Sequence, residues 1–329
     1  MNHQEQVIII GAGPCGLAAA ISLKRIGLNP LLLEKESIVN SIFLYPTNMQ
    51  FFSSPELLEI GDIPFSTAND KPYRAEALSY YRKAAKHHQL RIHSYEEVTA
   101  VQPTEPGFRV ESQTRAGEVK HYQADHVVIA TGYFDNPNRL DIPGEELDKV
   151  SHFFREAHPY SGTNVAIIGG SNSAIDAALE LHRVEANVTV VYRKSDYSPQ
   201  IKPWVLPGFR SLVEKGRIRM MFQSQVTQIK PGSIVINQQN EGLTELDNDF
   251  VLALTGFKPN RRFLTSIGVH MDNETEKPVI HPETMETNIP GLYIAGVIAS
   301  GSNANEVFIE TGRFHGDLIA KHLQEQRSR

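Results

Sequence analysis

The chain has little of what would mark a secreted, membrane-spanning or nucleic-acid-binding protein. Its 329 residues include one cysteine, which excludes an internal disulfide framework and fits a reducing cytosol. No apolar run approaches the roughly eighteen residues of a membrane span. An apolar run begins within a few residues of the amino terminus, so we expect no signal peptide. A net charge of −6 without a basic block argues against nucleic acid. We therefore expect a cytoplasmic protein of two ordinary domains, with no metal ion.

What the sequence does have is two glycine-rich turns, each behind an apolar run and ahead of a helical pattern. The first is Gly11-Ala12-Gly13-Pro14-Cys15-Gly16, after the apolar residues 7–10. A helix that starts directly after a strand leaves its first amide N–H groups unpaired and its dipole positive, so it binds a pyrophosphate. Gly11 permits the tight turn, Gly13 lets the backbone approach the phosphates, and Gly16 lets the helix pack on the strand.

An acidic residue completes the first unit. Glu34 ends the next apolar strand, 31–33, at the distance of about twenty residues that a ribose-binding acid requires. Its carboxylate can accept hydrogen bonds from ribose hydroxyl groups and would repel a 2′-phosphate. The first turn therefore suits FAD or NAD rather than NADP.

In the second unit, cations stand where the first unit has an acidic residue. It reads Gly169-Gly170-Ser171-Asn172-Ser173-Ala174 after the apolar residues 165–168, with Ser171 in place of the second glycine of the pattern. The next strand leads to Arg193 and Lys194, which can pair with the 2′-phosphate of NADPH. The alternative is that both are solvated charges at a strand end. Two such turns indicate that two dinucleotides meet and pass electrons.

The remaining pattern predicts an α/β fold. We expect two Rossmann-like dinucleotide-binding domains of three-layer ββα type, the NADPH domain inserted in the FAD domain: 1–150 and 257–329 for FAD, and 151–256 for NADPH. Helices are expected at 17–25, 74–88 and 174–184, and strands at 91–93, 98–101, 108–112, 121–123, 127–130, 188–192, 251–254 and 292–295. A closing helix over 305–324 would turn Phe308, Leu318, Ile319 and Leu323 toward a core.

At this point the chain resembles the two-dinucleotide flavoproteins that include thioredoxin reductase. The resemblance rests on both glycine turns and on Ala130-Thr131-Gly132, Thr255-Gly256 and the segment 291–296. It implies an FAD site formed by Gly11, Gly13, Pro14, Cys15, Gly16, Glu34, Lys35, Val98, Thr131, Gly132, Gly296 and Val297. The implied NADPH site comprises Gly169, Gly170, Ser171, Asn172, Ser173, Ala174, Arg193, Lys194, Thr255 and Gly256.

Two departures separate the chain from thioredoxin reductases. Those enzymes carry a C-x-x-C dithiol just before the second turn, where residues 150–158 here contain no cysteine. They also usually carry Asp after the Ala-Gly pair, where Val297 stands here. A dithiol relay is therefore impossible in this chain.

The one cysteine, Cys15, lies inside the first turn. The helix N-terminus would lower the pKa of its thiol and make it a nucleophile, or the residue is a small apolar replacement for Ala. The turn, residues 152–160 and residues 304–316 together resemble bacillithiol disulfide reductases. That resemblance implies a cytoplasmic, homo-oligomeric FAD enzyme that uses NADPH and for which this cysteine is a proposed catalytic residue.

The predicted reaction is hydride transfer from NADPH to FAD and reduction of a small disulfide, through a mixed disulfide with Cys15 in one version. The malate carboxylates of bacillithiol call for cations, and the candidates are Arg155, Lys202, Arg313 and His315, although solvation explains each of them equally. The segment 197–204 is either a mobile nicotinamide-site loop or an exposed connection.

Three alternatives stay open. A ferredoxin or flavodoxin:NADP reductase on the same scaffold needs no thiol. A flavin monooxygenase is suggested by the histidines before the second turn, but no glycine lies four residues before His152 or His158, so the usual fingerprint is incomplete. A redox sensor without catalysis would read the NADPH state by domain rotation.

Overall fold

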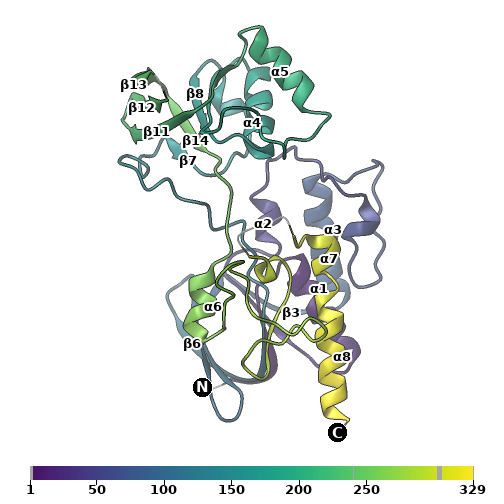
Figure 1. Ribbon diagram of the computed structural model, residues 1–329. Coiled ribbons are helices and arrows are strands. Elements are labelled where there is room, and N and C mark those ends of the chain that lie inside the picture. Colours follow the sequence, from purple (N-terminus) through teal and green to yellow (C-terminus); the bar gives the residue numbers. More distant parts are fainter. Residues whose placement is uncertain (1–2, 240, 302–305, 329) are drawn as a thin grey trace. The chain divides into compact units, whose positions relative to one another are not determined.

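The computed structural model describes residues 3–239, 241–301 and 306–328 (Figure 1). The chain divides into two compact units, the first formed by Met1–Leu44, Met49–Asn136 and Phe257–Arg329. The second, formed by Tyr45–Asn48 and Pro137–Gly256, is inserted in the first. Both are α/β with parallel strands, as the sequence predicts. As a compact unit, the inserted part begins at Pro137 rather than at residue 151, because Leu140, Ile142 and Leu147 pack against its core.

The first unit is built on a seven-stranded sheet in the order β3-β2-β1-β6-β5-β4, with β15 also paired to β6. Its central strands are apolar on both faces, as in parallel sheets covered on both sides. The strands are β1 (His3–Ile10), β2 (Leu31–Glu34), β3 (Arg91–Ser94), β4 (Glu96–Pro103), β5 (Phe108–Thr114), β6 (Val119–Ile129) and β15 (Leu292–Ile294).

Strand β6 corrects one sequence prediction. The two strands expected at 121–123 and 127–130 form one continuous strand, Val119–Ile129. One edge of β6 pairs with β1 from Tyr122 to Ile129, while the other edge pairs first with β5 and then with β15. The polar residues Asp125 and His126 lie at this change of partner, which explains why the sequence there looks like a break.

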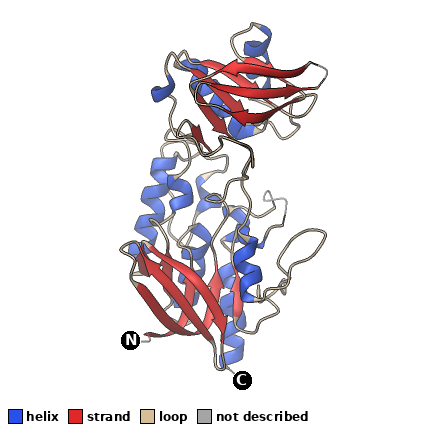
Figure 2. Ribbon diagram, turned by 90° about the vertical axis from the view of Figure 1, so that its left-hand side faces the viewer, coloured by secondary structure: helices blue, strands red, loops and turns tan. Residues whose placement is uncertain are grey.

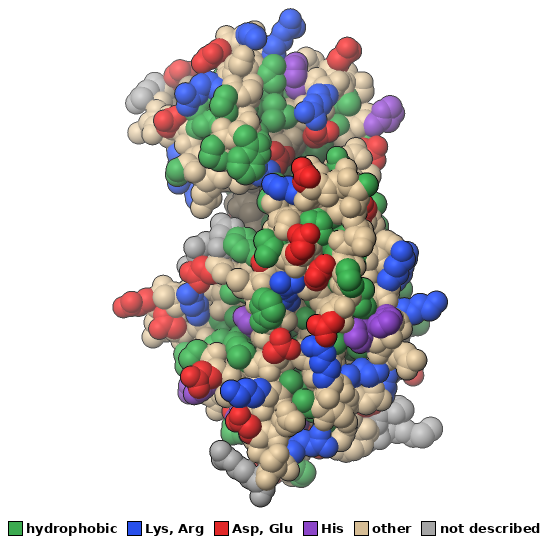
Figure 3. All heavy atoms as spheres, turned by 90° about the vertical axis from the view of Figure 1, so that its right-hand side faces the viewer, with side chains coloured by type: hydrophobic (Ala, Val, Ile, Leu, Met, Phe, Trp, Pro, Cys, Tyr) green, Lys and Arg blue, Asp and Glu red, His purple; other side chains and the backbone are tan. Residues whose placement is uncertain are grey.

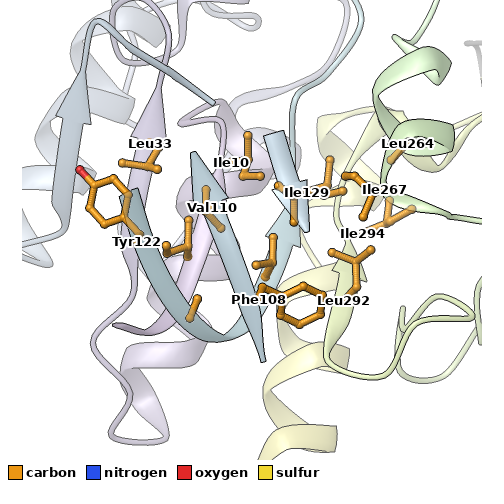
Figure 4. Close-up of a cluster of buried hydrophobic side chains, with 14 of the residues drawn as sticks. Ile10, Leu33, Phe108, Val110, Tyr122, Ile129, Leu264, Ile267, Leu292 and Ile294 are labelled. Atoms are coloured by element: carbon orange, nitrogen blue, oxygen red, sulfur yellow. The ribbon is translucent and has the colours of Figure 1, made fainter. Parts of the chain in front are cut away.

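A core of buried apolar side chains lies on one face of this sheet (Figure 4). Phe108, Val110 and Tyr122 come from its antiparallel part. Leu264 and Ile267 of helix α6 (Arg261–Ile267), which lies against β4, join the same core as side chains of the parallel strands. Both parts of the sheet are therefore fixed by one core.

Helices cover the other face. They are α1 (Pro14–Arg25), α2 (Asn40–Phe43), α3 (Arg74–His87), α7 (Ile309–Gly312) and α8 (His315–Arg327), with the 3₁₀ turn η1 (Pro55–Leu58). The 3₁₀ turn η3 (Val297–Ala299) instead contributes Ile298 to the core described above. Helix α8 packs closely on α1, since a Cβ on Gly316 would lie 2.4 Å from the Ala19 Cα. This contact holds the carboxyl-terminal helix on the helix of the first glycine turn.

The predicted single closing helix is wrong. The chain forms α7 and α8 instead, and the expected start at Asn305 lies outside the described residues. Ile319 and Leu323 are buried as expected, whereas Phe308 is 49% exposed. The break follows Gly312, whose close approach to Cys15 and Gly296 fixes the path of α7.

The inserted unit has a parallel sheet in the order β10-β9-β8-β14-β7 and a separate antiparallel sheet, β11-β12-β13. Figure 2 shows the strands of each unit in red and the helices packed beside them in blue. The strands are β7 (Val150–Ser151), β8 (Asn164–Ile168), β9 (Asn187–Val191), β10 (Arg219–Met221), β11 (Ser224–Ile229), β12 (Ser233–Gln238), β13 (Gly242–Asp247) and β14 (Phe250–Ala253). The helices are η2 (His158–Tyr160), α4 (Asn172–Arg183) and α5 (Leu206–Glu214).

Acidic and basic side chains are interspersed on the face drawn in Figure 3 rather than gathered by sign. In the part of the chain that the structure describes, none of the helices has the length and apolar character needed to cross a membrane.

Candidate functional site

One edge of the first sheet brings together the first glycine turn, Glu34 and the turns at Thr131-Gly132 and Gly296. Strands β1, β2, β6 and β15 are parallel, so their carboxyl ends share that edge. This edge carries the turn 11–16, Glu34, Thr131-Gly132 and Gly296. The local patterns therefore combine into one candidate site.

The three glycines of the first turn have different surroundings. Gly11 has φ +103°, and a Cβ there would lie 2.5 Å from the Ala130 carbonyl oxygen. A Cβ on Gly16 would lie 2.2 Å from the Gly11 carbonyl oxygen, so helix and turn meet only without a side chain. A Cβ on Gly13 would meet nothing within 4 Å. Gly13 thus faces open space at the start of α1, with Pro14 in the first turn and no side-chain cap on the helix.

Glu34 is buried against the glycine turn. One carboxylate oxygen accepts a hydrogen bond from the Ala12 N–H at 2.7 Å, and the other accepts one from the Glu36 N–H at 2.9 Å. Burial raises the pKa of Glu34 above its ordinary value, although both hydrogen bonds act in the opposite direction. Each oxygen keeps a lone pair that can accept a ribose hydroxyl.

Other features of this edge leave room for a ligand. The buried Thr131 hydroxyl has no hydrogen-bond partner among the described residues, which is uncommon for a buried polar atom. Gly132 has φ +70° and only the Ser41 hydroxyl within 4 Å of a Cβ position. Lys35 forms an ion pair with Asp135, three residues after Gly132. The Val98 side chain packs against the first core, so a role in holding a cofactor would fall to its backbone.

Cys15 lies in the first turn of α1, in contact with two glycines. A Cβ on Gly296 would lie 3.0 Å from the Cys15 Sγ, and one on Gly312 would lie 2.8 Å from it. Burial, and then the charge of Glu310, raise the pKa of the Cys15 thiol to about 12. The alternative in which the pKa of this thiol is lowered is therefore not supported, because burial and Glu310 both act in the opposite direction. Val297 follows Gly296 at the start of η3 and leaves this side of the site apolar.

His315 and Arg313 also belong to the first unit. The His315 Nδ1 accepts a hydrogen bond from the Gly296 N–H at 3.1 Å, and burial lowers the pKa of His315. The Arg313 guanidinium donates to the carbonyl oxygens of Glu56 and Glu59 at 2.9 and 2.6 Å. Both side chains are thus bonded to backbone, and His315 carries no full charge near neutral pH.

The second candidate site lies at the carboxyl edge of the inserted sheet, where β8, β9 and β14 end side by side. Gly169 has φ +143°, and a Cβ there would lie 2.4 Å from the Leu254 carbonyl oxygen. A Cβ on Gly170 would fall 2.4 Å from the ring of the buried Tyr192. Ser171 precedes α4 without capping it through its side chain. Ser173 is exposed and Ala174 is buried at the start of the helix.

Two neighbouring strand ends complete this edge. Arg193 and Lys194 are exposed and follow β9 after the buried Tyr192. Thr255 and Gly256 are held by Asn138, whose N–H donates to the Gly256 carbonyl at 2.9 Å. The Asn138 carbonyl accepts from the Thr255 hydroxyl at 2.8 Å, and its amide donates to the Thr255 carbonyl at 3.2 Å.

Asn172 and the candidate substrate cations make contacts that the sequence did not predict. The Asn172 amide is bonded at both ends to residues 200 and 202 of its own unit. Lys202 forms an ion pair with Asp176 at 2.9 Å. Arg155 and Lys202 belong to the inserted unit, and Arg313 and His315 to the first. The four candidate side chains therefore do not all belong to one unit.

Sequence reasoning missed three residues that shape these sites: Asn138, Asp135 and Gly312. Asp135 and Asn138 stand in a proline-containing link, where their polar character is ordinary for a loop. Gly312 interrupts the closing helical pattern, and that interruption was the available signal. Within the described ranges, no group of three or more His, Cys, Asp or Glu side chains is placed to hold a metal ion.

Comparison with known proteins gives consistent matches over the whole chain. The family model of pyridine nucleotide-disulphide oxidoreductases matches residues 8–296. Bacilliredoxin reductase Bdr of Bacillus subtilis is 50% identical over 326 residues, 99% of each chain. The solved structure of bacillithiol disulfide reductase Bdr from Bacillus cereus is similar with a TM-score of 0.95, at 51% identity over 98% of this chain and 100% of that one. The Staphylococcus aureus structure of the same name has a TM-score of 0.93, at 46% identity over 99% of both chains.

Proposed function

Because the chain belongs to the family of pyridine nucleotide-disulphide oxidoreductases, we propose that it is an NADPH-dependent, FAD-containing reductase of bacillithiol disulfide. The observation that carries the proposal is the contrast between two dinucleotide turns. A buried acid, Glu34, stands at the first, and two exposed cations, Arg193 and Lys194, stand at the second. An acid selects against a 2′-phosphate and cations select for it.

The first site fits FAD. The uncapped start of α1 offers backbone N–H groups and a positive dipole to the pyrophosphate, and Gly13 leaves room for it. Glu34 would accept the ribose hydroxyls, and the Thr131 hydroxyl would find its missing partner on the cofactor. When bound, FAD accepts a hydride from NADPH and delivers two electrons to the disulfide.

The second site fits NADPH. The start of α4 would take its pyrophosphate beside Gly169 and Ser171, and Arg193 with Lys194 would take its 2′-phosphate. Thr255 and Gly256, fixed by Asn138, would form the opposite wall. In the net reaction NADPH, a proton and one disulfide give NADP⁺ and two thiols.

In this proposal Cys15 exchanges with the substrate disulfide. Its sulfur bonds to one half of the substrate, the other half leaves as a thiol, and two electrons with two protons then release the second thiol and restore Cys15. Since its raised pKa keeps Cys15 protonated at neutral pH, the attack must be coupled to removal of the thiol proton.

The name of the B. subtilis relative supports a second acceptor, an oxidised bacilliredoxin. The purified protein should be yellow and should oxidise NADPH faster than NADH with its true acceptor. Bacillithiol disulfide and oxidised bacilliredoxin are offered separately, with ferredoxin, quinone and oxygen as comparisons. Turnover with ferredoxin or oxygen alone would overturn disulfide reduction and favour a reductase or monooxygenase of the same scaffold. Turnover no faster than that of free flavin would favour a sensor.

Replacing Cys15 by Ala tests the thiol. We expect NADPH oxidation with the disulfide to fall at least about a hundredfold, since the exchange step loses its nucleophile. The variant should keep its yellow colour, because Ala is small enough for the turn and leaves its backbone unchanged. Unchanged turnover would refute the role of Cys15 and leave the rest of the proposal standing. We also place the enzyme in the cytoplasm as a homo-oligomer, which fractionation and light scattering check.

A further inference from the structure

The segment of residues 196–205, here called the strap, crosses the start of α4 on its way from β9 to α5 (Figure 1). The Asn172 side chain, in the first turn of α4, fastens it at two points. Its amide nitrogen donates to the Gln200 carbonyl at 2.8 Å, and its amide oxygen accepts from the Lys202 N–H at 3.0 Å. Both the nitrogen and the oxygen of the Asn172 amide are therefore hydrogen-bonded to the strap.

Buried side chains anchor the strap to the same unit. Ser198 and Ile201 are each 4% exposed, and Ile201 joins the core of the inserted unit. The Tyr197 ring meets the rings of Phe209 and Phe222 edge-on, at 6.1 and 5.0 Å between centroids. These contacts exclude a freely mobile loop.

The strap delivers one cation to α4. The Lys202 Nζ lies 2.9 Å from an oxygen of Asp176, with the lysine side chain 12% exposed. Asp176 follows Asn172 by one helical turn and is the first acid of the helix, since the first turn holds none. The other acid of α4, Glu180, is already paired with Arg183 near the end of the helix.

The placement matters for a phosphate at the start of α4. An unpaired carboxylate one turn away would repel the pyrophosphate and offset part of the helix dipole. Paired with Lys202, Asp176 adds no net charge there. The two Asn172 hydrogen bonds hold the Lys202 backbone in the position that keeps this pair closed.

We propose that Lys202 and Asn172 are positioning residues for the pyridine nucleotide: the strap neutralises Asp176, so that α4 receives the pyrophosphate without repulsion. The inference rests on the proposed function, in which α4 takes that pyrophosphate. It assigns Lys202 to the nucleotide site and not to the disulfide substrate.

Removing the Lys202 charge, first alone and then together with the Asp176 charge, tests the proposal. Calorimetric titration with NADP⁺ should show the Kd of Lys202→Met raised about fivefold, the size of one interaction between partly exposed charges. The double variant Lys202→Met with Asp176→Asn should return to within about twofold of the wild type, since the exposed carboxylate is gone. Glu180→Gln, which removes an acid from the far end of the same helix, should bind as the wild type does. With saturating NADPH, the kcat of Glu180→Gln should equal that of the wild type.

Two further measurements separate the possible failures. 2′-AMP, which carries the 2′-phosphate but no pyrophosphate, should bind Lys202→Met and wild type alike. Asn172→Ala should raise the Kd for NADP⁺ about twofold and speed the fluorescence depolarisation of Trp204, the one tryptophan, which lies on the strap and is 69% exposed. If the double variant stays as weak as Lys202→Met, the neutralisation is wrong and Lys202 acts otherwise. If the wild type binds neither NADP⁺ nor 2′-AMP, the nucleotide assignment itself falls, and this inference with it.

Discussion

The two glycine turns follow one pattern, yet different positions in them are sterically required. In the first turn Gly16 cannot carry a side chain, because a Cβ would lie 2.2 Å from the Gly11 carbonyl oxygen. Its counterpart in the second turn is Ala174, whose methyl group is accommodated. Conversely, Gly170 is required by the Tyr192 ring, whereas its counterpart Ala12 is buried without difficulty. The need for glycine therefore depends on what packs against each position, and the motif alone does not give it.

The turns also differ in how closed they are. The position of Cys15 in the first is enclosed by Gly296 and Gly312, while the matching Ser173 in the second is exposed. The first turn is fixed by backbone contacts and a buried carboxylate. The second is completed by side chains that reach in from the strap and from neighbouring strand ends.

The largest expected effect is on thiol reactivity. A thiol with a pKa of about 12 has a far smaller thiolate fraction at neutral pH than an exposed one, so Cys15 should be alkylated about a thousandfold more slowly than a cysteine placed at Ser173. The comparison uses wild type and the double variant Cys15→Ala with Ser173→Cys, each with one thiol, and iodoacetamide labelling followed by mass spectrometry. Equal rates would show that the two turns are equally open. Cys15→Ala alone should take no label.

Stability should separate the turns next. Gly16→Ala should destabilise the first unit by about 3 kcal/mol through overpacking, while Ala174→Gly should cost the second about 1 kcal/mol through backbone entropy. Urea unfolding followed by circular dichroism reports both units. Trp204 fluorescence reports the inserted unit, to which the one tryptophan belongs. An earlier Trp204 transition in Gly16→Ala would contradict the assignment of the strain to the first unit.

The smallest expected effect concerns pH. Burial lowers the pKa of His315, so the unfolded chain binds a proton more readily than the folded one. The contribution of neutral His315 is then present above the unfolded pKa of about 6.5 and lost as pH falls below it. His315→Asn, which keeps an acceptor for the Gly296 N–H, should flatten the fall in the urea midpoint between about pH 7 and pH 5. Identical slopes for variant and wild type would show that the pKa of His315 is the same in the folded and unfolded states.

Much of this fold is predictable because its signals are local. An apolar run, a glycine turn and a helix lie within a few residues of one another, and Glu34 is found by its spacing. The meander β11–β13 was not predicted, because its polar, exposed third strand lacks a clear alternation. Strand β6 was divided in two because its partner changes midway, and a sequence does not display its partners.

The candidate sites divide in the same way. Residues next to a glycine turn could be predicted, but the state of the Cys15 thiol could not. That state depends on Gly296 and Gly312, far along the chain, and on how closely they approach. Likewise the chemistry of Asn172 suggested a ligand contact, and only the fold shows that the strap occupies its amide.

The two ends of the first unit that flank residues 137–256 are in direct contact. Asn136 and Lys258 are joined by two hydrogen bonds, of 2.9 and 3.0 Å, and the rings of Phe134 and Phe257 stack with centroids 4.2 Å apart. Cutting out everything between these residues would leave two ends that are already neighbours, so a short splice would close them with little loss of chain entropy. In such an architecture the inserted unit can be exchanged during evolution for one with a different nucleotide preference, while the first unit keeps its core.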